Sequence, residues 1–228
     1  MIFCVFVAVW FSIRQKETLT IENRIPFTRS LFVSGFVELL KYKSTLVYTI
    51  ISGIIMGSFM LYLSSSQQIF QDQYGLVDEF PYIFAGLALS FGASTFLNGR
   101  LVMKYGMEKL IKISMSGYTL TSLIYLIVFY NQENPSIEVL LLFLFLQFLS
   151  LGFLFGNLKS ISLQPIGHIA GIGAAITGFI STLFAVPIGA FIGNFISASA
   201  YPMFVGFFAC GLCSVLLYVV YKRSKYSI

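Results

Sequence analysis

The chain has 228 residues, of which 57% are hydrophobic and 10% are charged, whereas soluble domains have about 45–50% apolar and about 25% charged residues. With a mean hydropathy of +0.87, this composition excludes an ordinary soluble domain and predicts a chain surrounded by membrane lipid. The net charge of +5 does not indicate nucleic acid as a partner, because the basic residues lie between apolar segments and not on one soluble face.

The first apolar segment, residues 1–13, is shorter than the roughly 20 residues that a transmembrane helix needs. We interpret it as a partial transmembrane helix, the end of a span that is complete in a longer protein. It is not typical of a signal peptide, because Arg14 and Lys16 follow the apolar residues instead of preceding them. Residues 14–44 form a basic cytoplasmic linker, whose second half predicts either a helix along the membrane surface or an early start of the next span.

Six longer apolar segments follow, and each is long enough to cross a bilayer as a helix. The sequence therefore predicts an all-α membrane protein with a six-helix bundle over residues 45–221 and a cytoplasmic tail over residues 222–228. The six segments are residues 45–63, 81–101, 110–130, 139–158, 169–196 and 201–221.

The charges of the connections alternate along the chain. All 14 Lys and Arg residues lie in the linker, in every second connection or in the tail, and the other connections carry only acidic charges. Because Lys and Arg are enriched in cytoplasmic loops, we expect a multi-pass inner-membrane protein with a cytoplasmic C-terminus. The acidic connections contain Asp72, Asp78, Glu79, Glu133 and Glu138.

Small residues recur at steps of three or four in the fifth long segment, so they are expected to share one face of a single helix. In a bilayer, small residues let two helix backbones approach closely, and Gly189 with Gly193 forms a GxxxG pair. We predict that this face packs against another helix. The stripe consists of Gly167, Gly171, Ala174, Gly178, Thr182, Ala185, Gly189 and Gly193.

The sequence contains few residues that could form a catalytic, metal or cofactor site. Cys210 and Cys213 form a CxxC, but in an apolar helix they lack the further ligands of a metal site, so we expect no metal. Gly171 and Gly173 begin a GxG pattern, yet Ile176 stands where a dinucleotide-binding loop needs its third glycine. With no histidine or buried acid at membrane depth, the sequence predicts neither catalytic residues nor a bound cofactor.

Two polar residues invite a functional interpretation. Gln147 lies near the centre of an apolar segment, where an amide needs a partner, so it either contacts substrate in a cavity or bonds to another helix. His168, the only histidine, lies with Pro165 in the next connection. We expect these two residues to shape the turn rather than to form a proton relay.

The connection after the second long segment carries a recognisable pattern of glycines and basic residues. Gly99, Lys104 and Gly106 match the turn signature of the major facilitator superfamily, which this stretch resembles, although Met103 replaces its aspartate. The pattern predicts a close helix crossing at Gly99 and a tight turn at Gly106. It also predicts that Arg100 and Lys104 interact with helix C-termini.

Residues 151–157 and 164–171 extend this resemblance. They are similar to the tenth helix, the following turn and the eleventh helix of the bicyclomycin-resistance (Bcr/CflA) branch of the drug/proton antiporters. Residues 70–76 and 17–19 also look like that branch. The resemblance therefore implies the end of helix 6 and helices 7 to 12, the C-terminal half of a major facilitator fold.

This resemblance implies efflux of a small-molecule drug or metabolite by alternating access, driven by a proton gradient. The expected partners are membrane lipid and an N-terminal transporter half, whose second helix would pack on the small-residue stripe. Packing within this chain is the alternative for the stripe. A non-transporting remnant or an accessory membrane subunit is the alternative for the function.

Overall fold

The computed structural model describes residues 2–15, 28–130, 134–196 and 199–226. Its contacts divide the chain into two compact units, residues 1–34 and residues 35–228. Within the described ranges the secondary structure consists of helices and contains no strand, which confirms the all-α class. In the first unit, α1 (Ile2–Arg14) is apolar and has no buried residue.

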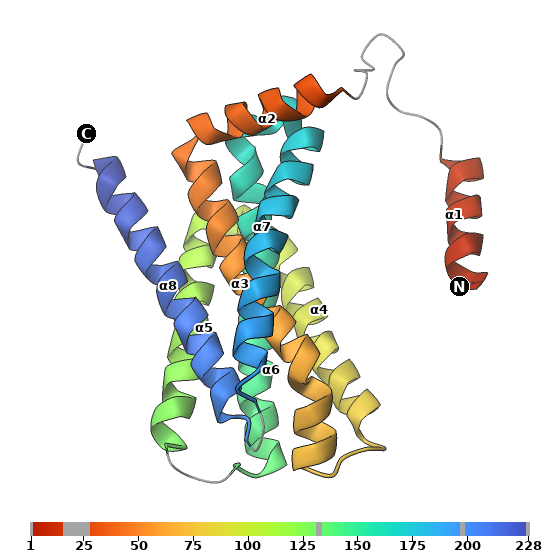
Figure 1. The fold of residues 1–228 in the computed structure, drawn as a ribbon, viewed down its shortest axis with the longest axis vertical. Coiled ribbons are helices and arrows are strands. Elements are labelled where there is room, and N and C mark those ends of the chain that lie inside the picture. The colour runs from red at the N-terminus through yellow and green to blue at the C-terminus, as the bar shows by residue number, and fades with distance from the viewer. Residues whose placement is uncertain (1, 16–27, 131–133, 197–198, 227–228) are drawn as a thin grey trace. The chain divides into compact units, whose positions relative to one another are not determined.

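The second unit contains six long helices that alternate in direction (Figure 1). Each corresponds to one of the six apolar segments, with ends that differ by several residues. The helices are α3 (Lys43–Gln67), α4 (Phe80–Tyr105), α5 (Met107–Val128), α6 (Ile137–Leu163), α7 (Ala170–Gly193) and α8 (Tyr201–Tyr226).

Five continuous helical stretches in the described ranges are long and apolar enough to cross a membrane, and one of them, Ile137–Gly193, has 57 residues. A straight helix of that length would extend about 85 Å, nearly three times the apolar thickness of a bilayer. The stretch instead reverses at the 3₁₀-helix η3 (Gln164–Ile169), where Ile166 leaves helical geometry. It therefore contains two passes, α6 and α7, as Figure 1 shows.

Several helix ends differ from the ends of the apolar segments. Residues 222–226, part of the expected cytoplasmic tail, continue α8 as a helix, since no helix-breaking residue interrupts them and Lys222 forms an ion pair with Glu108 of α5. The helix α3 continues past residue 63 into the π-helix η2 (Gln68–Gln73). Linker residues 16–27 lie outside the described residues, but α2 (Arg29–Lys41) is separated from α3 by Tyr42, whose backbone is extended.

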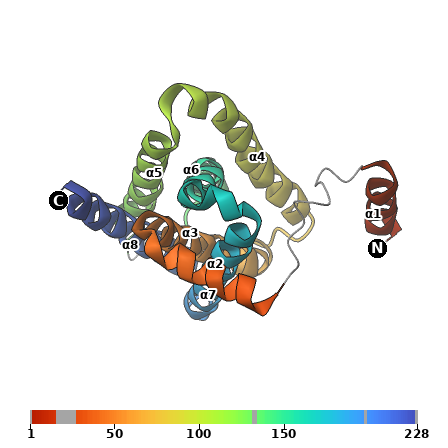
Figure 2. The same cartoon turned by 90° about the horizontal axis from the view of Figure 1, so that it is seen from above.

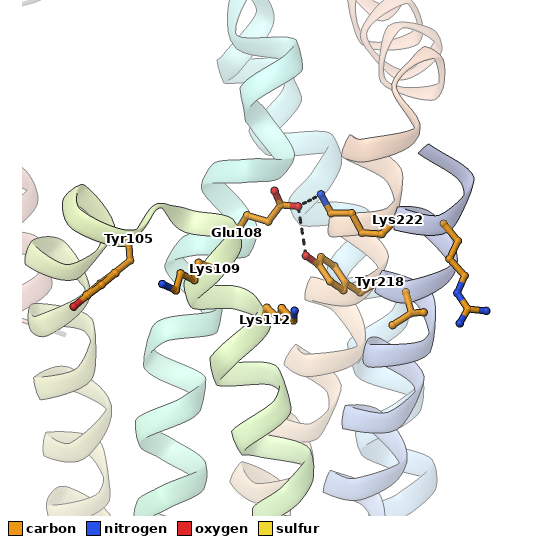
Figure 3. Close-up of a pocket in the computed structure, with 8 residues that line it drawn as sticks. Tyr105, Glu108, Lys109, Lys112, Tyr218 and Lys222 are labelled. Atoms are coloured by element: carbon orange, nitrogen blue, oxygen red, sulfur yellow. Dashed lines mark hydrogen bonds and ion pairs between the residues drawn. The ribbon is translucent and has the colours of Figure 1, made fainter. Parts of the chain in front are cut away.

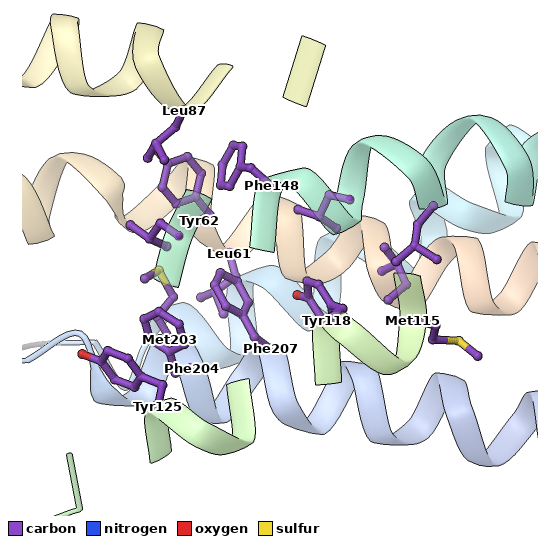
Figure 4. Close-up of a cluster of buried hydrophobic side chains, with 14 of the residues drawn as sticks. Leu61, Tyr62, Leu87, Met115, Tyr118, Tyr125, Phe148, Met203, Phe204 and Phe207 are labelled. Carbon is purple, nitrogen blue, oxygen red and sulfur yellow. The ribbon is translucent and has the colours of Figure 1, made fainter. Parts of the chain in front are cut away.

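Aromatic and aliphatic side chains fill the space between α3, α5, α6 and α8 (Figure 4). Tyr125 of α5 stacks on Phe204 of α8 with ring centroids 3.6 Å apart. Tyr62 of α3 packs edge-on against Phe148 of α6 at 4.7 Å. Such contacts fix the helices at definite rotations, and Figure 2 shows α6 lying between α4 and α5.

The crossing of α3 and α7 depends on small residues from both helices. A Cβ atom at Gly57 of α3 would lie 2.8 Å from the Cβ of Ile188, and one at Gly189 of α7 would lie 3.0 Å from the Cβ of Met60. Ala185, one turn before Gly189, is buried. Backbone approach therefore holds this pair together, as expected for helices in lipid.

The small-residue stripe is not one continuous packed face. Gly167 lies in η3 rather than in α7, because the chain reverses there. Gly171 and Gly178 have open space where a Cβ would lie, whereas Gly189 packs on α3 and Gly193 lies near Ser64 and Ser65. Gly189 and Gly193 thus serve packing within the chain, whereas no described residue lies within 4 Å of a Cβ position at Gly167, Gly171 or Gly178.

Candidate functional site

A recess of about 270 Å³ lies between α3, α6 and α7. Ser52 of α3 is nine residues from the start of its helix, or about 14 Å along the axis, so the recess reaches well into the bundle. The sequence pattern places Gly178 and Thr182 in the small-residue stripe and gives no signal for the other residues of the recess. The recess is lined by Ser52, Met56, Phe155, Lys159, Ser162, Thr177, Gly178, Ser181 and Thr182.

Hydroxyl groups give the recess its polar character. Thr177 and Thr182 donate to the carbonyls of Gly173 and Gly178, four residues earlier in α7, at 2.8 and 2.9 Å. Ser181 donates to the carbonyl of Thr49 in α3 at 3.3 Å. Because these hydroxyl protons are engaged by backbone, the oxygen lone pairs remain to accept bonds from a ligand.

Lys159 contributes the one charged group of the recess lining, near the end of α6 where it turns into η3. Among the described residues of the lining there is no Asp, Glu or His. The arrangement can therefore bind N–H and O–H donors through several oxygens and an anionic group through Lys159.

Gln147 is fully buried between α6 and α5 rather than lining the recess. Its amide nitrogen donates to the Tyr118 carbonyl oxygen at 3.2 Å and to the Ser122 hydroxyl of α5. Its Oε1 has no hydrogen-bond partner among the described residues. In this structure the amide joins two helices.

The turn with the glycine and basic pattern is a single residue, Gly106, between α4 and α5. Its backbone has φ 78° and ψ 154°, a region that is accessible essentially to glycine alone. No described residue lies within 4 Å of a Cβ position at Gly99, so a close crossing there stays a prediction. Arg100 lies over the Phe96 ring at 5.4 Å, and Lys104 over the Tyr105 ring at 5.2 Å.

Pro165 and His168 both lie in η3, the turn between α6 and α7. The His168 Nε2 atom is 3.9 Å from the Glu38 carboxylate of α2, and its side chain is 58% exposed. The Lys41 ammonium donates to Glu38 at 2.7 Å, and this bond lowers the pKa of Glu38. His168 thus faces α2 at the surface of the bundle.

Two polar contacts between helices were not expected from the sequence. Asn98 of α4 and Asn157 of α6 form reciprocal amide bonds of 3.4 and 2.6 Å. Glu108 of α5 pairs with Lys222 of α8 and accepts a bond from Tyr218 at 3.4 Å (Figure 3). A sequence shows each side chain but not which distant helix lies opposite to it.

Glu108 and Lys222 belong to a basic groove between the start of α5 and the end of α8. The groove has a volume of about 950 Å³, and Figure 3 shows Lys109 and Lys112 beside it. It is lined by Tyr105, Glu108, Lys109, Lys112, Tyr218, Val219, Lys222 and Arg223.

Six antiparallel apolar helices, with a polar recess between α3, α6 and α7, define a multi-pass membrane protein. The chain is 24% identical over 183 residues to an "Uncharacterized MFS-type transporter YdgK" of Bacillus subtilis, covering 80% of this chain and 45% of that protein. It is 28% identical over 222 residues to a "Bicyclomycin resistance protein homolog" of Haemophilus influenzae, covering 89% of this chain and 50% of that protein. No family model and no solved structure matches the chain.

The chain spans about half the length of the relatives that it matches. One of these relatives is named as an MFS-type transporter, so the likeness points to the major facilitator superfamily. The low identities extend over most of this chain.

Proposed function

We propose that the chain forms one six-helix bundle of a small-molecule exporter, corresponding to the C-terminal half of a major facilitator transporter. The observation that carries this proposal is the hydroxyl-lined recess between α3, α6 and α7. In alternating-access transporters of this kind, substrate binds near the midplane at the interface between two bundles. The recess would then form one wall of the substrate site, and an N-terminal six-helix bundle would form the other.

The open face of α7 supports the same arrangement. Gly171 leaves space for a close neighbour, and Phe179 and Leu183 of the same helix are 61% and 60% exposed. We propose that a helix of the N-terminal bundle packs here, next to the recess. The basic end of the bundle, which includes Arg223, would face the cytoplasm of a cell with this protein in its inner membrane.

The substrate that fits this surface is a small molecule with several N–H or O–H donors, because the recess presents hydroxyl oxygens as acceptors. A drug is a candidate because one relative is named for bicyclomycin resistance. Since the recess lining contains no acid or histidine, coupling to a proton gradient would depend on residues of the N-terminal bundle. The chain alone is therefore expected to show no proton-coupled export.

The test measures bicyclomycin accumulation in cells that produce this chain together with an N-terminal bundle. Thr182→Val should raise accumulation at an unchanged amount of inserted protein, because it replaces an acceptor oxygen of the recess with a methyl group. Thr119→Val is the matched control: Thr119 also donates to a carbonyl four residues earlier, at 2.8 Å, but lies in α5 outside the recess. Equal accumulation in the two variants would refute the recess as the substrate site, and no export with any N-terminal bundle would refute transport.

A further inference from the structure

We propose that the basic groove between α5 and α8 binds the headgroup of an anionic phospholipid. This site is separate from the recess and does not depend on the proposed transport. The four basic residues of the groove and its one carboxylate give a formal balance of +3. Lys222 is engaged by Glu108, so Lys109, Lys112 and Arg223 carry this excess.

No carboxylate among the described residues forms an ion pair with Lys109, Lys112 or Arg223. The Lys109 ammonium lies over the Tyr105 ring at 5.1 Å, which orients it without neutralising it. Lys109 and Lys112 also lie in the first two turns of α5, where the helix dipole is positive and disfavours further positive charge. A phosphate in the groove would compensate the charges of all three side chains and of the helix end.

The surface next to the groove is apolar and can contact the acyl chains of a lipid. Val219 lines the groove. Leu216 precedes Val219 in α8 by about one turn, and Leu212 precedes Leu216 by another; they are 54% and 40% exposed. On α5, Ile113 follows Lys109 by one turn and is 57% exposed, and Leu120 is 56% exposed. Side chains at these spacings share a face of their helix, so exposed apolar residues continue from the basic groove on both helices.

The basic groove and the apolar surface next to it together favour one class of ligand. A soluble phosphate would use only the basic end, and an acidic peptide would gain nothing from exposed aliphatic side chains within the bilayer. A phospholipid places its phosphate at the membrane interface and its acyl chains beside the apolar helices. Basic pockets between transmembrane helices bind such headgroups, and Tyr105 and Tyr218 at the groove are typical of the interfacial region.

The experiment uses the full chain purified in mild detergent and exposed to equal amounts of phosphatidylglycerol and phosphatidylcholine. Native mass spectrometry then gives the ratio of the two lipids that remain bound. The unmodified chain should retain phosphatidylglycerol preferentially, and the Lys112→Gln/Arg223→Gln pair should lower that preference on the order of tenfold, because two interfacial charges are lost. The preference should also fall with rising salt.

The control pair is Lys43→Gln/Arg100→Gln, which removes the same charge from residues outside the groove. Lys112→Arg should keep the preference, which distinguishes loss of charge from loss of fold. The proposal is overturned if both double variants lower the preference equally or if neither does. It is also overturned if inorganic phosphate displaces the bound lipid completely at equal concentration, because the site would then recognise a free anion.

Discussion

The crossing of α3 and α7 allows a quantitative test of how this bundle is held together. We predict that Gly57→Ala destabilises the chain relative to Gly178→Ala. Both glycines lie within long helices, so both replacements gain helix propensity, about 1 kcal/mol each. The two positions differ in the space available for a side chain. A Cβ at Gly57 would lie 2.8 Å from both Cβ and Cγ2 of Ile188, whereas a Cβ at Gly178 has no neighbour within 4 Å.

The size of the expected destabilisation follows from the need to move α3 away from α7. At Gly57 the nearest atoms belong to a β-branched side chain and to the Ala185 carbonyl at 3.3 Å, neither of which can move without the backbone. Overpacking of this kind costs about 1–3 kcal/mol. We therefore expect the two variants to differ by about 1–3 kcal/mol, a difference of about 2–12 °C in unfolding midpoint for a domain of this size.

The assay is thermal unfolding of the purified chain in one mild detergent, followed by intrinsic tyrosine fluorescence and by loss of helical circular dichroism. Gly178→Ala should unfold at or above the midpoint of the unmodified chain, and Gly57→Ala should unfold below Gly178→Ala. Equal midpoints for the two variants would refute the argument that backbone contact between α3 and α7 stabilises the bundle.

Three further predictions concern other positions. Gly106→Ala should lower the unfolding midpoint, because an alanine at φ 78° adds about 1–3 kcal/mol of backbone strain. Gly99→Ala is the control and should not lower the midpoint, because Gly99 lies in a helix with open space around its Cβ position. Equal midpoints for the two variants would contradict a strained turn at Gly106. Gln147→Leu should leave inserted protein and stability nearly unchanged, as measured by membrane yield and unfolding midpoint, because it removes two bonds together with an unpartnered buried oxygen. A large loss of inserted protein would show that those bonds are essential. The lowered pKa of Glu38 means that its ionised form is favoured in the folded state, so its stabilising contribution is present above its ordinary pKa and is lost as pH falls through the lowered value. Unfolding midpoints of the unmodified chain and Glu38→Gln should therefore differ at pH 7 and converge in acid, and a constant difference would contradict this assignment.

The six passes could be predicted from the sequence because hydrophobic length and charge placement are properties of single segments. A helix in lipid must satisfy its own backbone, so an apolar run of sufficient length predicts a helix without knowledge of its neighbours. Gly106 was also predictable, since a glycine between two apolar segments indicates a tight turn. The charged residues after Tyr221 predict the end of the apolar span but not the end of the helix, because nothing in their sequence breaks a helix and α8 continues to Tyr226.

Contacts between helices were less predictable, because they depend on rotation about each axis and on the neighbour opposite. Spacing alone placed Gly167 on the same helical face as Gly189, but the chain reverses between α6 and α7 at Gly167. Serine and threonine within apolar helices usually bond to their own backbone, so Thr177 and Ser181 gave no signal that they line a recess. The pairing of Glu108 with Lys222 joins residues far apart in sequence, and only the packing of α5 against α8 brings them together.

The ion pair between Glu108 and Lys222 has a practical consequence for anyone who modifies this protein. A fluorescent protein or affinity tag joined after Tyr221, where hydropathy suggests that the last span ends, would delete the ammonium that Glu108 contacts. Among the described residues, the carboxylate would keep the hydroxyls of Tyr48 and Tyr218, at 3.3 and 3.4 Å. Fusion partners therefore belong beyond Tyr226, the last helical residue of α8, and a poor yield from a shorter version would report a lost contact rather than an intolerance of the tag.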